Sequence, residues 1–379
     1  MESRGRSFAV DVTIKPTYRC NFECSYCCIH QFGRSPLPEL SADDAIRVLE
    51  GVCERDPSCE KMLVKWHGGE PLVLGRDYFE HVFEWQDSQS RVFDNAVFTN
   101  LTLLDDDLAE LFAEHDAHIY TSLDTTFPEH DVQRGGRCAE VCQHLERLRE
   151  LGFSKVTVKS TVTAKTVCDL PAVYEFMKTL PFEWNFGPVF PSGRGSKDYL
   201  AIMPDPAEFT SIAQDIFDDW VITNGTRVYL FDQVLDELLN PCDPASVCRP
   251  MFNVDPFGDV YFCAQFHGDP AYRIGHFDDE DTADRFAART CEWSSFHFEP
   301  CDSCRYSRLC RFNHCSFLGD NLGLQDISCT RYLCEMFLPL FDHISAALAK
   351  QIDDARVASS PLSTASTNPP DALEHTTRR

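Results

Sequence analysis

Three cysteines near the start of the chain are spaced closely enough to share one metal centre. Cys20, Cys24 and Cys27 form the pattern Cys-x3-Cys-x2-Cys, directly after a segment that alternates as a strand does. Converging thiolates suit a soft metal or an iron–sulfur cluster. A structural zinc site is closed by four ligands, whereas a catalytic site keeps one position open. Three cysteines therefore predict a cluster with one free iron; a loop of structural cysteines, or a zinc knuckle with a distant fourth ligand, is the alternative.

The composition is that of a globular protein, and it argues against nucleic acid and membranes as partners. The chain has 379 residues, enough for one large or two ordinary domains. Its net charge of −26 argues against nucleic acid, whose phosphates need a basic surface. No apolar run reaches the length of a membrane span, and the first residues lack a signal-peptide core, so we expect a cytoplasmic protein with no membrane contact. Nineteen cysteines in that reducing compartment indicate metal ligation rather than disulfides.

Strand and helix patterns alternate over residues 8–189, which predicts an α/β fold with a parallel sheet. Parallel strands place their carboxyl ends at one edge of the sheet, and in barrels of this kind the loops at that edge carry the chemistry. The cysteine loop follows the first strand in this sense. The predicted strands cover 8–15, 62–66, 95–100, 118–123, 155–163 and 183–189, and the predicted helices between them cover 42–56, 76–90, 105–115, 138–151 and 170–180.

The predicted strands end in motifs that suit a small polar ligand. Glycines in a Gly-Gly-Glu-Pro loop would let the backbone approach a ligand, and its carboxylate could pair with an ammonium group. A hydroxyl and a guanidinium after the fourth strand would both donate to an anion. The alternative is an ordinary Gly/Pro turn and helix caps. The residues are Gly68, Gly69, Glu70 and Pro71 after the second strand, Asn100 at the end of the third, Ser122 and Asp124 at the end of the fourth, Arg134 beyond it, and the loop 191–195 after the sixth.

This order of cysteines and loops resembles the radical S-adenosylmethionine (SAM) superfamily. The resemblance implies a partial (β/α)6 TIM-type barrel over residues 8–225, with a 4Fe–4S cluster on the three cysteines whose open iron chelates SAM. Leu101 stands where the family often has Gly, so the loop directly after Asn100 departs from the family pattern. The implied SAM contacts are the 68–71 loop for the amino group, Ser122 and Arg134 for the carboxylate, Asn100 near the ribose or methionine, Asp124 near the ribose, and Tyr26 within the cluster motif.

The second half is dense in cysteines and weak in hydrophobic periodicity, so ligands rather than a large core should order it. Its cysteine order resembles the SPASM extension of radical SAM peptide-modifying enzymes, which implies two auxiliary 4Fe–4S clusters and three in all. A pair of zinc ribbons is the alternative. The implied domains are a bridging helix at 226–241, the extension at 242–350 and a disordered tail at 352–379. One auxiliary cluster would take Cys242, Cys248, Cys263 and Cys315, and the other Cys301, Cys304, Cys310 and Cys334.

Some cysteines depart from the family pattern or receive no role. Four residues, 311–314, separate two cysteines where the family has three, and Cys329 is the alternative to Cys334 as the last ligand. An aromatic run after Cys334 matches the family and favours it. Eight cysteines remain without a role: Cys28, Cys53, Cys59, Cys138, Cys142, Cys168, Cys291 and Cys329.

The resemblance implies an enzyme in which a 5′-deoxyadenosyl radical removes hydrogen from a side-chain carbon of a ribosomally made precursor peptide. A flavodoxin- or ferredoxin-like protein would donate the electron, and the barrel and extension, or a separate peptide-recognition protein, would bind the substrate. The favoured product is an oxidative side-chain crosslink of the cyclophane type; formylglycine in a sulfatase is the alternative. Sulfatase maturases place a catalytic Asp directly after the cysteine that corresponds to Cys263, and this chain has Ala264. An electron-transfer iron–sulfur protein is the alternative of another class, but it would need no SAM motifs.

Overall fold

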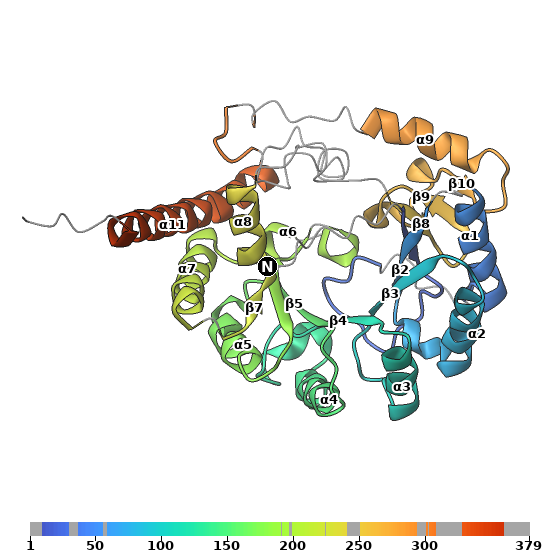
Figure 1. Cartoon of the computed structure of the whole chain (residues 1–379), viewed down its shortest axis with the longest axis horizontal. Coiled ribbons are helices and arrows are strands. Elements are labelled where there is room, and N and C mark those ends of the chain that lie inside the picture. The colour runs from blue at the N-terminus through green and yellow to red at the C-terminus, as the bar shows by residue number, and fades with distance from the viewer. Residues whose placement is uncertain are drawn as a thin grey trace, which may run out of the picture.

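Strands from both halves of the chain form one ten-stranded sheet in the computed structural model (Figure 1). The structure describes residues 10–29, 37–55, 59–190, 192–196, 199–223, 225–240, 251–293, 301, 303–307 and 328–359. The strand order is β10-β9-β8-β1-β2-β3-β4-β5-β6-β7. Neighbours are parallel from β8 to β7, and β9 is antiparallel to both β8 and β10. The strands are β1 (Val10–Ile14), β2 (Lys61–Trp66), β3 (Val92–Phe98), β4 (His118–Ser122), β5 (Val156–Val162), β6 (Glu183–Pro188), β7 (Arg227–Val228), β8 (Phe252–Val254), β9 (Asp259–Tyr261) and β10 (Gly275–His276).

Helices α1 to α5 lie along the outer side of the curved sheet, between successive strands (Figure 1). The long carboxyl-terminal helix packs against α7 and α8, where Thr210 donates to the carbonyl of Met336 at 2.9 Å. The helices are α1 (Ala42–Arg55), α2 (Arg76–Asp87), α3 (Asp106–Glu114), α4 (Cys138–Glu150), α5 (Leu170–Met177), α6 (Tyr199–Ile202), α7 (Pro206–Thr223), α8 (Tyr229–Leu239), α9 (Thr282–Trp293) and α11 (Ser328–Ser359), with short 3-10 turns η1 (Pro71–Leu74), η2 (Asp131–Arg134), η3 (Val167–Asp169), η4 (Gly193–Ser196), η6 (Ala264–Phe266) and η7 (Pro270–Tyr272).

The two faces of the sheet differ in polarity because side chains alternate along each strand. On β2, Val64 and Trp66 are fully buried beneath the helices. Lys61 and Lys65 point to the other face, where they pair with Asp94 and Asp11, each at 2.9 Å. The face opposite the helices is therefore charged, and the site loops open at its carboxyl edge.

The predicted parallel α/β order of the first half is confirmed. Each predicted strand and helix is present, with ends shifted by one to three residues where the structure describes them. The predicted barrel count of six units and the cluster-binding nature of the extension remain predictions. Among the described residues, no helix is both long and apolar enough to span a bilayer.

The second half departs from the expectation that ligands alone order it. Strand β8 pairs in parallel with β1, so residues 251–276 extend the same sheet. These strands have two or three residues each, too few for a hydrophobic period to be recognised. Helix α11 continues to Ser359, so residues 352–359 are helical where a disordered tail was expected. Cys242, Cys248, Cys310 and Cys315, like residue 191, lie outside the described residues.

Candidate active site

The loop that carries Cys20, Cys24 and Cys27 follows β1 and is fixed from two sides. The amide of Ser25 donates to the carbonyl of Gln133 in η2 at 2.9 Å. From the β6 end, Arg194 donates its amide to the carbonyl of Cys27 at 3.0 Å and its guanidinium to that of Cys24 at 3.2 Å. The loop after the sixth strand therefore holds the backbone of the cysteine loop.

The glycines of the loop after β2 are required by the cysteine loop. A Cβ on Gly69 would lie 2.6 Å from the carbonyl oxygen of Tyr18, and Gly68 has a φ of +140°. The amide of Gly69 donates to the carbonyl of Thr17 at 2.9 Å, and the amide of Glu70 donates to that of Arg19 at 2.8 Å. These glycines thus allow two site loops to join backbone to backbone, a role that the sequence analysis assigned to ligand approach.

Glu70 joins the loops after β2 and β3. Its side chain is buried, and one carboxylate oxygen accepts from the hydroxyl of Thr99 at 2.7 Å and the amide of Leu72 at 3.1 Å. The other oxygen accepts from the amide of Asn100 at 2.7 Å. Desolvation raises the pKa of Glu70 to about 7, although these donors oppose the shift. The Glu70 carboxylate therefore already accepts three hydrogen bonds from the chain, and an amino group of a ligand would use its remaining lone pairs.

Asn100 and Leu101 keep the backbone of the β3 loop in an unusual shape. The side-chain Nδ2 of Asn100 donates to the side-chain oxygen of Asn21 in the cysteine loop at 2.8 Å, and its Oδ1 accepts from the Thr102 hydroxyl at 2.6 Å. Leu101 is fully buried with a φ of +67°, the left-handed region that favours glycine. Leu101 therefore adopts the conformation that the family's glycine would adopt, at a cost of about 1–2 kcal/mol.

Asp124 is held by the chain itself. One of its oxygens accepts from the hydroxyl of Tyr26 and from the side-chain Nε2 of Gln133, the latter at 2.9 Å. The other accepts from the backbone amide of Thr161 on β5 at 2.8 Å. The carboxylate thus ties the cysteine loop, η2 and β5 together. Its predicted place near the ribose, and that of Tyr26 and Ser122 in the SAM site, stay predictions.

Arg134 is a buried cation that forms no hydrogen bond or ion pair with the described residues. It is 6% exposed, and its guanidinium lies 5.6 Å from the ring centre of Phe22 in the cysteine loop. Nearby Tyr26, Asp124 and Cys24 favour its charged form and raise its pKa, against the effect of burial. A buried guanidinium without a bonded partner is suited to bind an anion. This observation fits the carboxylate of SAM.

The three predicted cluster ligands lie near one another in the structure. Their thiols are free, and burial raises the pKa of Cys20 to about 11 and of Cys24 to about 12. No group of three His, Cys, Asp or Glu residues in the described part of the chain is placed to hold one metal ion. A cluster does not require such convergence, because each cysteine binds a different iron. The buried Arg134 beside these thiols completes the fit.

Part of the predicted second auxiliary set comes together in the structure. Cys301 and Cys304 lie in one turn, in which the amide of Cys304 donates to the carbonyl of Cys301 at 3.0 Å. Tyr306 anchors this turn to α11 through a 2.6 Å bond to Asp342. The Cys304 thiol lies close enough to Cys334 on α11 to raise its pKa, after the larger effect of burial. Cys329 lies on α11 as well.

A row of stacked rings runs from the residue after β2 across β3 to β4. The ring centres of His67 and Phe98 are 4.9 Å apart, those of Phe98 and Tyr120 are 4.6 Å apart, and those of Tyr120 and His118 are 4.2 Å apart. Burial and the charge of Lys15 lower the pKa of His67 to about 3, so its imidazole is neutral. The row offers a continuous stacked surface across these strands.

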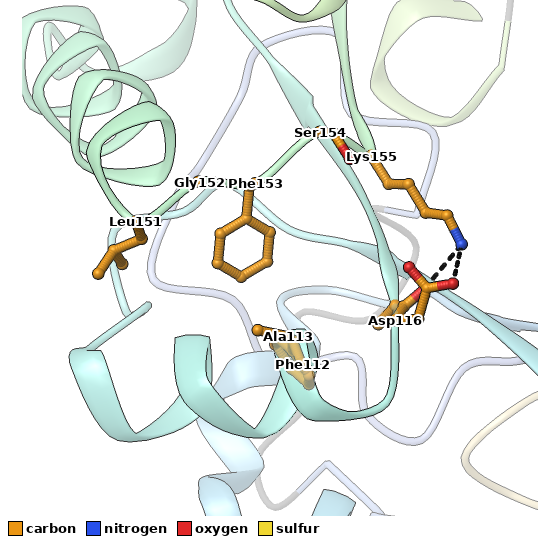
Figure 2. Close-up of a pocket in the computed structure, with 9 residues that line it drawn as sticks. Phe112, Ala113, Asp116, Leu151, Gly152, Phe153, Ser154 and Lys155 are labelled. Carbon is orange, nitrogen blue, oxygen red and sulfur yellow. Dashed lines mark hydrogen bonds and ion pairs between the residues drawn. The ribbon is translucent and has the colours of Figure 1, made fainter.

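The pocket in Figure 2 lies away from this site. It has a volume of about 110 Å³ and is lined by residues at the amino ends of β4 and β5, among them Phe112, Phe153 and Lys155. The site loops lie at the carboxyl ends of the same strands, so this pocket contains none of the predicted site residues.

Sequence reasoning missed Lys15 and Gln133, and it named the loop 191–195 without giving Arg194 a role. Lys15 is buried at the end of β1, and its ammonium donates to the carbonyl of Ala264 at 3.0 Å. Neither of the missed residues carried a signal in the sequence, because Lys15 falls at an ordinary polar position of the alternating strand pattern and Gln133 belongs to no motif. The contacts of Lys15 and Arg194 lie 249 and 170 positions away in the sequence, so spacing could not reveal them.

Comparisons with known proteins agree with these observations. Residues 14–177 match the sequence profile of the Radical SAM superfamily. A cysteine-type anaerobic sulfatase-maturating enzyme of Clostridium perfringens is 26% identical over 366 residues, which are 88% of this chain and 96% of that protein. The structure of native anSMEcpe with bound AdoMet and Cp18Cys peptide superposes with a TM-score of 0.73 at 22% identity, over 91% of this chain and 99% of that one.

A more distant structure shares the fold as well. Streptococcus suis SuiB bound to precursor peptide SuiA superposes with a TM-score of 0.59 at 16% identity, over 80% of this chain and 71% of that one. At these identities the two structural likenesses establish the fold alone.

Proposed function

We propose that this chain, a radical SAM enzyme by its domain at residues 14–177, is a peptide maturase that converts a Cys or Ser side chain to formylglycine. The observation that carries the proposal is the match to the Clostridium perfringens sulfatase-maturating enzyme, because it spans 96% of that protein and so includes the cysteine-rich half. The sequence analysis preferred a crosslink and kept formylglycine as the alternative. The relatives favour the alternative.

The chain's own residues would prepare the site for this chemistry. The thiols of Cys20, Cys24 and Cys27 would bind a 4Fe–4S cluster, and Arg134 and Ser122 would hold the carboxylate of SAM. When bound, the cluster and SAM supply a carbon-centred radical that removes a hydrogen atom from the substrate. Arg194 and Glu70 keep the surrounding loops in place through the bonds described above.

The extension would bind two auxiliary clusters with the cysteines named above. The proximity of Cys304 and Cys334 supports their place in one set. We propose a flavodoxin- or ferredoxin-like electron donor, and we propose that the barrel and extension, or a separate peptide-recognition protein, bind the substrate.

An oxidative side-chain crosslink remains a second candidate because of one residue. Ala264 follows Cys263, where the resemblance to sulfatase maturases requires a catalytic Asp. The carbonyl of Ala264 instead accepts from Lys15. A maturase without that carboxylate needs another proton acceptor or a different product.

The cluster assignment is tested by one pair of variants. Reconstituted Cys24→Ala should release no 5′-deoxyadenosine from SAM, while iron bound by the extension remains. Cys168→Ala is the matched control, because Cys168 is an exposed thiol on η3. This variant should cleave SAM as the wild type does. If Cys24→Ala still cleaved SAM, the assignment of these three cysteines would be wrong. Failure of the wild-type protein to cleave SAM would favour an electron-transfer protein.

The product is tested by anaerobic incubation with two kinds of peptide. A sulfatase active-site peptide with Cys or Ser should acquire an aldehyde, detected by mass and by reaction with a hydrazide. The short open reading frame nearest the gene should be co-expressed in parallel. Loss of two hydrogens from that peptide, with no aldehyde and a fragmentation gap between two side chains, would overturn formylglycine in favour of the crosslink.

A further inference from the structure

We propose that Lys15 supplies the positive charge that raises the reduction potential of an auxiliary cluster bound through Cys263. The inference rests on the proposed function, because that cluster is part of it. Lys15 is 1% exposed, and its ammonium donates to the carbonyl of Ala264, the residue after Cys263, at 3.0 Å. A residue of the first strand thus contacts the backbone of the cysteine-rich half directly.

The position of this ammonium is fixed by the sheet. The amide of Lys15 donates to the carbonyl of Val254 at 2.8 Å, which continues the pairing of β1 with β8. The chain then returns through the antiparallel strand β9, which ends at Tyr261, two residues before Cys263. Because both strands belong to one sheet, the distance between Lys15 and the Cys263 loop is a property of the fold and not of a flexible side chain.

Lys15 has no carboxylate partner among the described residues. Two other lysines that start from the same face of the sheet do: Lys61 pairs with Asp94 and Lys65 with Asp11, each at 2.9 Å. A buried charge is costly unless an opposite charge lies close to it. Burial lowers the pKa of Lys15 to about 8, so the ammonium is still charged at neutral pH and needs a counter-charge.

The groups around Lys15 in the described chain do not provide that counter-charge by direct contact. The thiols of Cys27, Cys28 and Cys263 and the carboxylate of Asp255 lie within electrostatic range. One oxygen of Asp255 accepts from the amides of residues 257 and 259, at 2.9 and 3.0 Å, and the other from the hydroxyl of Tyr18 at 3.1 Å.

The two imidazoles nearby are neutral. The Nδ1 atom of His67 accepts from the amide of Gly68 at 2.8 Å, and burial lowers its pKa. His267, four residues after Cys263, is 5% exposed, and burial and the charge of Lys15 lower its pKa well below the usual value. An anionic cluster with cysteine thiolates is the partner that this buried ammonium suits.

The consequence for the cluster follows from electrostatics. A reduced cluster carries one more negative charge than the oxidised one, and a fixed positive charge nearby stabilises the reduced form. Lys15 should therefore make the cluster at Cys263 a better one-electron acceptor. Because Cys27 also lies within range of Lys15, the same charge lies between the cysteine loop and the extension. Lys15 acts through the cluster, so it is a positioning and tuning residue rather than a catalytic one.

The test is a dithionite redox titration of the reconstituted full-length protein, followed by electron paramagnetic resonance. Each cluster accepts one electron from dithionite, and the midpoint potential of each signal is read separately. Lys15→Met should shift the midpoint potential of one auxiliary cluster to a more negative value. The midpoint potential of the Cys20–Cys24–Cys27 cluster should shift less. Lys15→Arg should stay near the wild type because it keeps the charge. Lys159→Met is the control: Lys159 is an exposed lysine of β5, which does not pair with β1 or β8, and its loss should leave the auxiliary midpoint unchanged.

Two results would overturn the inference. One is an unchanged auxiliary midpoint in Lys15→Met at full iron content; the other is an equal shift in Lys159→Met. Should Lys15→Met fail to load iron, Lys15→Gln, which keeps a hydrogen-bond donor but no charge, must show the negative shift. A wild-type titration that shows a single cluster would instead refute the auxiliary clusters of the proposed function, whatever Lys15 does.

Discussion

Replacing Gly193, in the loop after β6, with alanine should displace the cysteine loop that it contacts. Gly193 has a φ of +57°, and a Cβ built on it would lie 2.6 Å from the carbonyl carbon of Cys28, with the carbonyl oxygen of Cys27 closer still. These are backbone atoms, so no side-chain rotation can relieve the clash. The neighbouring Arg194, which holds the carbonyls of Cys24 and Cys27, would move with it.

The size of the effect follows from the distances. Ordinary contacts begin at 3.4 Å, so the Cys28 backbone has to retreat by about 0.8 Å. A misplacement of about 1 Å in an active site can reduce a rate by about a hundredfold. The positive φ adds about 1 kcal/mol of strain for any residue other than glycine. We therefore expect Gly193→Ala to cleave SAM about a hundredfold more slowly than the wild type.

Gly152→Ala separates strain from displacement. Gly152 has a φ of +81°, and a Cβ there meets nothing within 4 Å. This control should lose about 1 kcal/mol in urea unfolding and keep the wild-type rate of SAM cleavage. The assay is release of 5′-deoxyadenosine at equal iron content. The reasoning is refuted if Gly193→Ala cleaves SAM within threefold of the wild type, or if Gly152→Ala is slowed equally.

Two further predictions concern the buried charges of the site. Arg134→Gln should weaken SAM binding by roughly 30-fold or more, measured by anaerobic calorimetry, because a buried charged donor is lost. Arg137→Gln is its control: Arg137 lies over the same Phe22 ring but pairs with Glu140 at 2.7 Å, and its loss should change affinity less than threefold. Glu70→Gln should remove a pH dependence of stability. The folded-state pKa of Glu70, about 7, lies above the unfolded value of 4.5, so the wild type loses up to about 3 kcal/mol relative to Glu70→Gln as pH rises from 4.5 to 7. Parallel unfolding curves of the two iron-free proteins over this range would contradict that pKa.

The sequence predicted the fold of the first half because its signals are local. Alternating burial on β2 and the capping of α1 by Ser41, which accepts from the amide of Asp44 at 3.0 Å, involve residues a few positions apart. The short strands β8 to β10 carry no such signal, and the pairing of β8 with β1 joins residues about 240 positions apart. The extension was therefore expected to lack the sheet that it shares.

The same distinction holds for individual site residues. The expectation that Glu70 and Asp124 face a ligand came from their types, yet both carboxylates accept three bonds from the chain itself. Arg134 is the reverse case, because its type predicted an anion and the structure leaves its guanidinium without a bonded partner in the described chain. Burial and partner count decide such roles, and neither can be read from spacing.

The sequence alone determined which cysteines can bind one cluster and in which order the site loops follow one another. Cysteine spacing sets which thiols are near one another, and strand–helix alternation puts the loops at one edge of a parallel sheet, since both depend on neighbours in the chain. Only the tertiary structure decided that Gly193 touches the cysteine loop and that Lys15 reaches Ala264. Those contacts join residues 166 and 249 positions apart, and they exist because the packing of the sheet and its loops, not the local sequence, brings the backbones together.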